Sequence, residues 1–281
     1  MQFRMKICLA VVAVFALTLS EARAQWYDDF DSYVVGPVHG QGPWIHFGGP
    51  LPAEVSADVA FSGNHSLKFM TNSDPNAPDG HGSDTWVQYV DQTGLAVLTT
   101  GQWTFSYMTY IPTPSDPAGD SWHHSFLEQD SVISGNTEGV ALRHSHLSGG
   151  IVHHLPWANS GDVPGEPQLP LAFDAWKETR HEIDLDANNV DVYYDNTLLS
   201  SAPWDADGWA GAPGLGAWNG WVTGNHEDEM FYFDDFRLVE GFGGGGAQAS
   251  APEPTTLVMM LMGLGLGVLT FRRRRADRRF H

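Results

Sequence analysis

Apolar and polar side chains alternate along several short segments of the chain, which is the pattern of β-strands. The clearest example runs from Trp103 to Ile111, where every second side chain is aromatic or β-branched and the others include Thr and Ser. A period of two is typical of a strand that is buried on one face. Residues 66–70, 86–90 and 139–147 look extended as well. Because no part of the body shows sustained helical periodicity, the pattern predicts an all-β fold.

A hairpin is predicted in the second half of the body. Ile183 and Leu185 share one face, residues 186–189 have the composition of a turn, and the alternation resumes over residues 190–194. A last strand is predicted over residues 231–239. The segments between the predicted strands are rich in Gly, Pro, Asp and Trp, which indicates long loops.

Residues 1–24 are predicted to be a secretory signal peptide. Arg4 and Lys6 precede an apolar run over residues 7–19, and the segment ends in the small-residue sequence Ala-Arg-Ala. Signal peptidase is therefore expected to cut before Gln25. The single cysteine of the chain lies within this segment, so no disulfide is expected in the mature protein.

After a linker, the C-terminus combines three features in a fixed order. A linker rich in Gly, Ala and Ser spans residues 242–250, and residues 251–281 then hold a Pro-Glu-Pro sequence, an apolar run over 257–271 and an arginine block. The run is shorter than the roughly 20 residues that span a bilayer comfortably, and a basic block of this kind stays on the cytoplasmic side. We therefore expect a single short hydrophobic helix that is held briefly in the membrane and then removed. The residues that define this sorting signal are Pro252, Glu253, Pro254, Arg272, Arg273, Arg274 and Arg275.

These C-terminal features resemble the PEP-CTERM sorting signal. The resemblance covers about 30 residues and depends on the order of the three features. It implies a Gram-negative type bacterium with an exosortase that cleaves near the motif, after transient anchoring in the inner membrane. It also implies export to the cell surface or to an extracellular polysaccharide matrix.

Charge is distributed unevenly along the chain. The whole sequence holds 34 acidic and 14 basic side chains, but residues 25–250 hold 31 acidic and only five basic ones, a formal net charge of −26. Such a body repels phosphate groups, so nucleic-acid binding is excluded. Neutral ligands and cations suit it better.

The strand sequences resemble those of the concanavalin A-like lectin and glucanase fold, including laminin-G-like modules. The resemblance is carried by an acidic-aromatic segment at 27–33, by Trp176 with the hairpin at 180–196, and by the last strand at 231–239. It covers most of residues 25–241 and implies a two-sheet antiparallel jelly-roll sandwich. In that fold a concave sheet face often takes carbohydrate.

Three carboxylates at Glu182, Asp184 and Asp186 superficially resemble the catalytic strand of retaining β-glucanases. That pattern needs a further acidic residue after Asp184, at position 187, where this chain has Ala. Retaining hydrolysis requires two carboxyl groups about 5–5.5 Å apart. The alternative is an outward acidic face on a hairpin. No other complete catalytic set is present in the sequence, and we predict no catalytic residue.

Six histidines fall in three pairs between residues 123 and 154. They are either ligand-facing groups or polar positions on a solvated strand face, and no tight metal motif such as His-Glu-x-x-His is present. Exposed Trp side chains are the other candidates, since an aromatic face stacks on a sugar ring. The candidate ligand-binding residues are Trp122, His124, Glu128, Arg143, His144, His146, Trp204 and Trp209.

A structural Ca²⁺ site is predicted where the first and last strands meet. Asp29 and Asp234 are its candidate ligands, because hard carboxylate oxygens suit Ca²⁺ and the body carries excess negative charge. The alternative is that these carboxylates are solvated or cap turns.

The sequence thus predicts an exported cell-surface or matrix protein with a non-catalytic, carbohydrate-binding body. A polysaccharide hydrolase or lyase of the same fold is the alternative, and a purely structural matrix component is a third. The expected partners are signal peptidase, exosortase, the membrane during sorting, and a polysaccharide.

Overall fold

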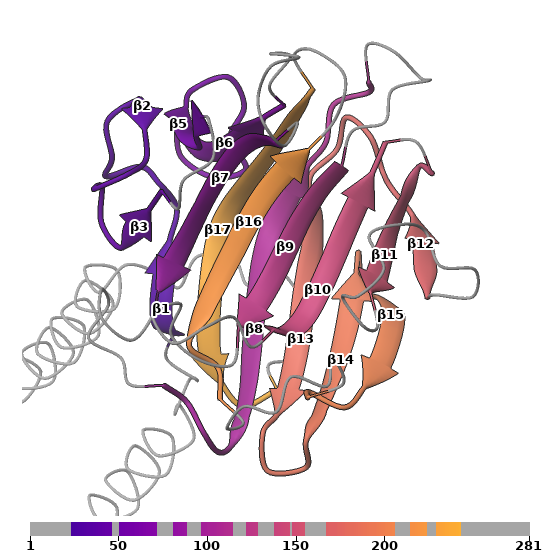
Figure 1. The fold of residues 1–281 in the computed structure, drawn as a ribbon. Helices are drawn as coiled ribbons and strands as arrows, with labels where there is room; N and C mark the ends of the chain where they lie inside the picture. Colours follow the sequence, from indigo (N-terminus) through magenta and orange to yellow (C-terminus); the bar gives the residue numbers. More distant parts are fainter. Residues whose placement is uncertain are drawn as a thin grey trace, which may run out of the picture. The chain divides into compact units, whose positions relative to one another are not determined.

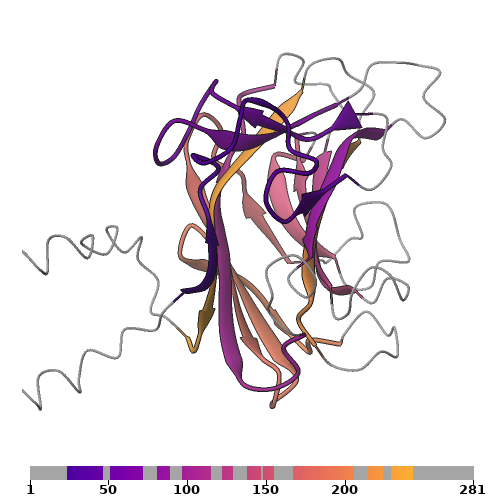
Figure 2. The same cartoon turned by 90° about the vertical axis from the view of Figure 1, so that its left-hand side faces the viewer.

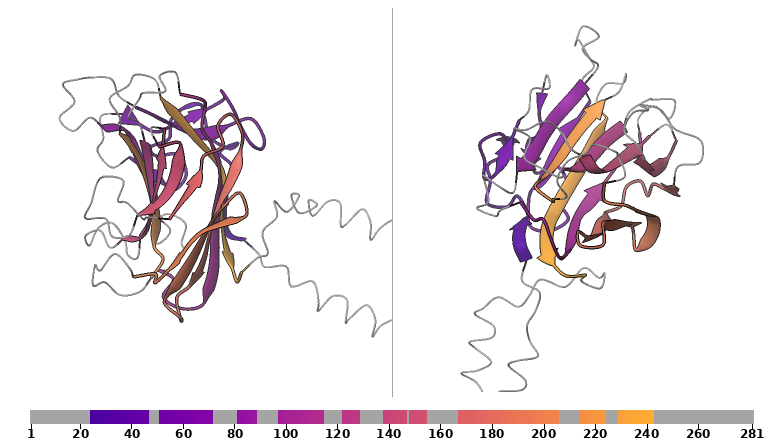
Figure 3. Two further views of the ribbon diagram at one scale, coloured as in Figure 1. Left: turned by 90° about the vertical axis from the view of Figure 1, so that its right-hand side faces the viewer. Right: turned by 60° about the horizontal axis from the view of Figure 1, so that its bottom comes forward.

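Two β-sheets packed face to face make up the part of the chain that the computed structural model describes (Figure 1). Figure 2 and the left view of Figure 3 show the sheets as separate layers. All strand pairs are antiparallel except one, which confirms the predicted all-β jelly roll. The described residues all lie in one compact unit, residues 1–243. They are 24–46, 51–71, 81–88, 97–114, 122–128, 138–146, 148–154, 167–205, 214–223 and 229–242.

The first sheet has nine strands in the order β15-β14-β13-β8-β17-β6-β5-β2, with β1 also paired to β17. Its strands are β1 (Ala24–Asp28), β2 (Gly36–Pro37), β5 (Glu54–Ser56), β6 (Ser66–Met70), β8 (Gln102–Tyr110), β13 (Lys177–Asp184), β14 (Asn189–Tyr194), β15 (Thr197–Ala202) and β17 (Met230–Glu240).

The second sheet has eight strands in the order β12-β11-β10-β9-β16-β7-β3, with β4 parallel to β7. Its strands are β3 (Trp44–Ile45), β4 (Leu51–Pro52), β7 (His81–Gln88), β9 (Trp122–Glu128), β10 (Glu138–Ser145), β11 (Gly150–His154), β12 (Gln168–Pro170) and β16 (Ala217–Thr223).

Aromatic side chains from both sheets fill the space between them. Tyr107 stacks on Phe236 with ring centroids 5.2 Å apart, and Trp218 from the other sheet meets Phe236 edge-on at 4.9 Å. These rings are fully buried, and such edge and offset contacts add to the free energy gained from burying their area. The alternation predicted for residues 103–111 is confirmed, since Trp103 and Phe105 belong to the same core.

A β-bulge interrupts β17. The pairing of β17 with β8 shifts between Asp234 and Arg237, and Asp235 has a φ of 50°. The extra residue lets Phe233 and Phe236 both enter the core although they are three positions apart. It also places two acidic residues side by side on the strand.

Apart from Ala24, which is the first residue of β1, the terminal signals lie outside the described residues. No helix within the described part of the chain is long and apolar enough to cross a membrane.

Candidate functional site

The outer face of the eight-stranded sheet, meaning the face turned away from the nine-stranded sheet, is built by strand alternation. On β10, Leu142 and His144 are fully buried towards the core, so Arg143 between them points the other way. On β16, Trp218 and Val222 belong to the core, which puts Trp221 on the outer face with Arg143.

Backbone register aligns a row of residues across this outer face. Arg143 pairs with position 124 on β9, which pairs with Trp221 on β16, which in turn pairs with Asp84 on β7. Val152 on β11 completes the row on the other side of Arg143. Adjacent strands are about 4.8 Å apart, so a row across five strands extends about 19 Å.

Three of the predicted ligand residues lie on β9, separated from one another by an even number of positions. Trp122 pairs with Ser145 and Thr223, His124 with Arg143 and Trp221, and Glu128 with Ala217. The structure describes the backbone of these three residues and not their side chains.

Arg143 is only 4% exposed. A buried guanidinium needs polar partners, and this one has interactions with the rest of the chain. Its planar fork of five N–H donors suits hydroxyl or carboxylate oxygens of a ligand when one of these partners is exchanged.

The remaining predicted ligand residues do not share this face. His144 and His146 pack against Phe233 and Phe231 of the other sheet, and Trp204 belongs to the core between the sheets. Trp209 lies outside the described residues. Burial lowers the pKa of His144 to about 3, so its ring is neutral at pH 7. The sequence left two interpretations of the histidine pairs, solvated positions or ligand-facing groups. His144 is neither, because its ring is buried in the core.

A buried histidine cluster lies between the sheets. His123, His144, His153 and His181 come from β9, β10, β11 and β13, and each is at most 2% exposed. His123 packs against Phe233 with ring centroids 4.4 Å apart. Burial lowers the pKa of His181 to about 3. All four rings are core groups, and His144 and His181, whose pKa values burial lowers to about 3, remain neutral in the folded protein at pH 7.

His146 lies at the end of β10, beside the cluster. Its Nδ1 is 2.9 Å from a carboxylate oxygen of Glu229, and its ring stacks on Phe231 with a centroid separation of 4.7 Å. Burial lowers the pKa of His146 to about 4.

Trp221 and Asn219 were not among the predicted ligand residues. Both lie on β16, and Asn219 pairs with Phe126 in the row next to Arg143. The segment Ala217–Thr223 does alternate, with Trp218 and Val222 at core positions. That alternation is the sequence signal by which Trp221 could have been found.

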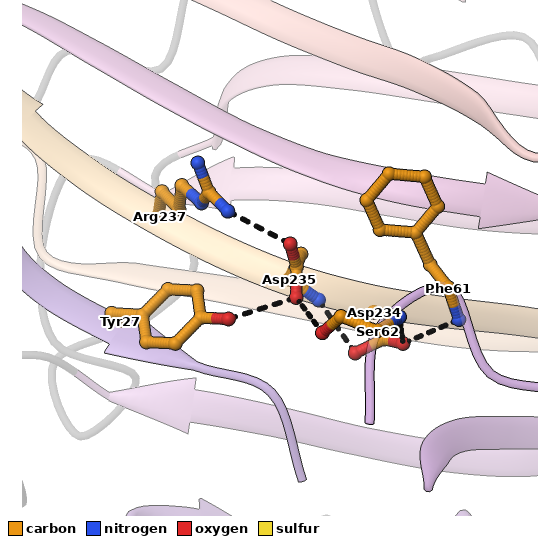
Figure 4. A network of polar contacts seen from close by, with 6 residues as sticks. All are labelled: Tyr27, Phe61, Ser62, Asp234, Asp235 and Arg237. Carbon is orange, nitrogen blue, oxygen red and sulfur yellow. Dashed lines mark hydrogen bonds and ion pairs between the residues drawn. The ribbon is translucent and has the colours of Figure 1, made fainter. Parts of the chain in front are cut away.

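Acidic residues at the β17 bulge form a second polar network (Figure 4). The Oδ2 atom of Asp234 accepts the backbone N–H groups of Phe61 at 2.8 Å and Ser62 at 3.2 Å, and Oδ1 accepts the N–H of Asp235 at 2.8 Å. Asp235 accepts hydroxyl hydrogens from Tyr27 and Ser62 and pairs with Arg237. The network ties the loop at 57–65 and strand β1 to β17.

Asp29 and Asp234, the predicted Ca²⁺ ligands, contact backbone N–H groups in this structure. Both oxygens of Asp234 already accept N–H groups, and Oδ1 of Asp29 accepts the N–H of Asp31 at 3.1 Å. No group of three or more metal-ligating side chains occurs within the described ranges. Burial raises the pKa of Asp234 to about 7, although hydrogen bonds from three backbone N–H groups act to lower it. The turn-capping alternative matches these contacts.

The glucanase-like carboxylates on β13 have structural partners. Glu182 lies 3.2 Å from Nε of Arg180. Asp184 accepts hydrogen bonds from the Gln102 amide and from the N–H of Ala187, both at 2.8 Å. The hydrogen bond from Ala187 caps the hairpin turn. This contact is consistent with the alternative of an outward acidic face on a hairpin.

Residues 250–275 match the PEP-CTERM protein-sorting motif. This motif marks an exported surface protein that exosortase processes. No curated protein matches the chain.

Solved structures with the same fold are enzymes and lectin-like domains. An endo-β-1,4-glucuronan lyase from the fungus Trichoderma reesei has a TM-score of 0.54 and 12% identity, covering 78% of this chain and 97% of the lyase. The catalytic domain of a glycoside hydrolase family 131 protein from Coprinopsis cinerea has a TM-score of 0.52 and 15% identity over 82% of this chain and 100% of that domain. The Emp46p carbohydrate recognition domain in its metal-free form has a TM-score of 0.50 and 8% identity over 79% of this chain and 100% of that domain. At these identities the likeness shows the fold alone.

Proposed function

We propose that the chain is an exported surface or matrix protein whose body binds a polysaccharide on the outer face of the eight-stranded sheet. The observation that carries this proposal is the register row of Arg143, position 124 and Trp221. It places a guanidinium on β10 and an indole on β16, the two strands that flank β9. A sugar chain needs this combination of hydrogen-bond donors and an aromatic face.

The charge of the body favours a neutral chain as the ligand. A formal net charge of −26 over residues 25–250 works against close approach of a polyanion, while it leaves uncharged hydroxyl groups unaffected. Arg143 is one of only five basic residues in that body. The guanidinium N–H groups of Arg143 would then donate to the ring and hydroxyl oxygens of the sugar chain.

Processing at both ends completes the proposal. Signal peptidase removes residues 1–24, the run at 257–271 anchors the chain transiently in the inner membrane of a Gram-negative type bacterium, and exosortase cleaves near residues 252–254. The match at 250–275 supports the exosortase step. Mass spectrometry of the exported protein should find an N-terminus at or beside Gln25 and no Arg272; recovery of the full chain in the cytoplasm would contradict it.

A polysaccharide lyase is the second candidate function, and one specific observation favours it. Position 124, a histidine, pairs directly with Arg143. An arginine that holds a uronate carboxylate beside a histidine that abstracts a proton is a workable arrangement for β-elimination. The shared fold with a glucuronan lyase is compatible with this chemistry.

A polysaccharide panel with the exported protein separates the two candidates. Pull-down without product supports binding, and unsaturated or reducing products support an enzyme. Trp221→Ala and Arg143→Lys should weaken retention at least tenfold. Arg237→Ala, on the other sheet, is the matched control and should bind as the wild type does. Equal retention by all four proteins would contradict the proposed surface.

A further inference from the structure

An aromatic patch lies on the outer face of the nine-stranded sheet, on the opposite side of the sandwich from the Arg143 row. It consists of Phe61, Tyr110 and Trp176. Ring centroids of Phe61 and Trp176 are 5.9 Å apart, and those of Tyr110 and Trp176 are 5.5 Å apart. Phe61 is 38% exposed, and the other two rings are half-buried.

Backbone and side-chain contacts with β17 and the loop at 57–65 hold the residues of the patch in place. The backbone N–H of Phe61 is fixed on the buried carboxylate of Asp234, from which the ring extends away (Figure 4). Tyr110 pairs in register with Tyr232, whose hydroxyl donates to Asp58 at 3.3 Å. Aromatic groups that are ordered before binding lose little conformational entropy when a ligand arrives.

Two hydrogen-bond donors border the rings. Among the described residues, the indole N–H of Trp176 and the hydroxyl of Tyr110 form no hydrogen bond with the protein and are not buried. Tyr27, Tyr33 and Tyr232, by contrast, all donate to carboxylates. Solvent therefore occupies the Trp176 and Tyr110 donors in the free protein, and a ligand with hydroxyl groups can replace it.

We propose that the aromatic patch is a second glycan-binding surface, which takes a single chain of a neutral polysaccharide. Apolar C–H faces of pyranose rings stack on the side chains, and ring hydroxyls accept from Tyr110 and Trp176. The strongly acidic body disfavours anionic chains.

Ring geometry selects the form of that ligand. The Phe61 and Trp176 rings are inclined by 65°, and those of Tyr110 and Trp176 by 47°. Rings that are not coplanar cannot lie together on the flat surface of a crystalline polysaccharide. They suit one soluble chain whose successive sugars turn about its axis.

This inference goes beyond the proposed function, because the two surfaces lie on opposite sheets. A protein with both surfaces holds two chains at once and cross-links them. A protein already bound to one chain of a matrix then meets the neighbouring chains at a raised effective concentration. Cross-linking of matrix glycans is a role that neither surface provides alone.

The test measures each surface in the absence of the other, with the exported protein and a panel of soluble neutral polysaccharides. In a Trp221→Ala background, we expect a residual retention in affinity electrophoresis, at least tenfold weaker than that of the wild type but still measurable. Adding Trp176→Ala should reduce it at least tenfold, and Phe61→Ala should reduce it too. Phe242→Ala, which removes an exposed ring elsewhere, is the matched control and should leave it unchanged. Trp176→Phe keeps a stacking ring and should retain part of the binding.

Clustering of polysaccharide-coated beads tests the cross-linking. Wild type should cluster beads, and either single variant, Trp176→Ala or Trp221→Ala, should bind without clustering. The inference is overturned if the Trp221→Ala protein binds no glycan of the panel, if Trp176→Ala and Phe61→Ala leave its binding unchanged, or if Trp176→Ala abolishes a dimer seen by light scattering. Failure of the proposed function is distinct, because then Trp221→Ala has no effect while Trp176→Ala removes all binding.

Discussion

Asp234 shows how one buried carboxylate organises a surface. It is fully buried and accepts three backbone N–H groups, two of them from the loop that carries Phe61. Asp234→Asn replaces one acceptor oxygen by an NH₂ group, so at least one buried N–H loses its partner. The free energy of unfolding should fall by about 1–3 kcal/mol for each N–H left unpaired.

Urea unfolding checks this change, with Asp29→Asn as the control. Asp29 accepts one N–H in an exposed hydrogen bond, so its substitution should cost well under 1 kcal/mol. A smaller effect for Asp234→Asn than for Asp29→Asn would show that the N–H groups do not depend on this carboxylate.

Thermal melting with Ca²⁺ and with chelator tests the predicted ion separately. Since the oxygens of Asp234 are occupied by N–H groups, we expect any rise in melting temperature with Ca²⁺ to be equal in wild type and Asp234→Asn, as charge screening of an acidic body would produce. A Ca²⁺-dependent rise that only the wild type shows would support the predicted site at Asp29 and Asp234.

Gly220 marks a close approach between the sheets. A Cβ at this position would lie 2.5 Å from Cη2 of Trp218 and 3.0 Å from ring atoms of His123 and Phe69. Gly220→Ala should therefore lower the free energy of unfolding by about 1–3 kcal/mol through overpacking. Gly150→Ala in the same sheet is the matched control, because its Cβ would meet only the movable side chain of Gln168.

Both substitutions are measured by urea unfolding at equal protein concentration. The expected order of stability is wild type, then Gly150→Ala, then Gly220→Ala. The reverse order of the two variants would mean that Trp218 can move aside and that the core between the sheets is not tightly packed.

At the scale of single elements, strand positions followed from the sequence because alternation is local. The predicted segments at 66–70, 103–111 and 231–239 correspond to β6, β8 and β17 within a residue or so. The hairpin turn lies at residues 185–188, one residue earlier than the predicted 186–189, with Asn188 at a φ of 53°.

The bulge in β17 could not be read from alternation. Asp234 and Asp235 interrupt the apolar pattern in the same way that a solvent-facing residue does. Only the pairing with β8 and the hydrogen bonds to the loop at 61–62 show that one residue is extra and that Asp234 is buried.

The candidate site shows the same limit. Alternation separates Arg143 from His144 but does not say which of them faces the second sheet. Phe233 on β17 packs against His144, and this non-local contact decides the matter. Sequence reasoning therefore pointed to strands β9 and β10, but it could not show that His144 and His146 lie on the buried side, against Phe233 and Phe231.

Strand β13 provides a direct test of the hydrolase alternative. Glu182 is an ion-pair partner of Arg180, whose guanidinium also lies over the Tyr193 ring at 4.5 Å. Glu182→Gln should leave any release of reducing sugar unchanged and lower the free energy of unfolding by less than about 1 kcal/mol. A loss of product with unchanged stability would show instead that the β13 carboxylates are catalytic.

For the whole molecule, the buried histidines set a limit on acid stability. His144, His146 and His181 have pKa values of about 3 to 4 in the folded protein because burial disfavours the charged ring. The unfolded chain holds these rings near their ordinary pKa of about 6.5. Between these values the unfolded state binds more protons, so stability is lost as pH falls below about 6.5.

Between pH 6 and 5 the three rings together should lower the free energy of unfolding by about 3–4 kcal/mol. Asp234 acts in the opposite direction, because its raised pKa of about 7 makes the folded state hold the extra proton. That gain is about 1 kcal/mol per pH unit, so the net loss should be about 2–3 kcal/mol.

Urea unfolding at pH 7.5, 6.0 and 5.0 measures how steeply the free energy of unfolding depends on pH. His144→Leu removes one titrating ring and should reduce the slope by about one proton, whatever its effect at pH 7.5. A slope unchanged by His144→Leu would mean that His144 does not carry this proton linkage, and a flat profile between pH 6 and 5 would mean that the buried cluster takes up protons without unfolding.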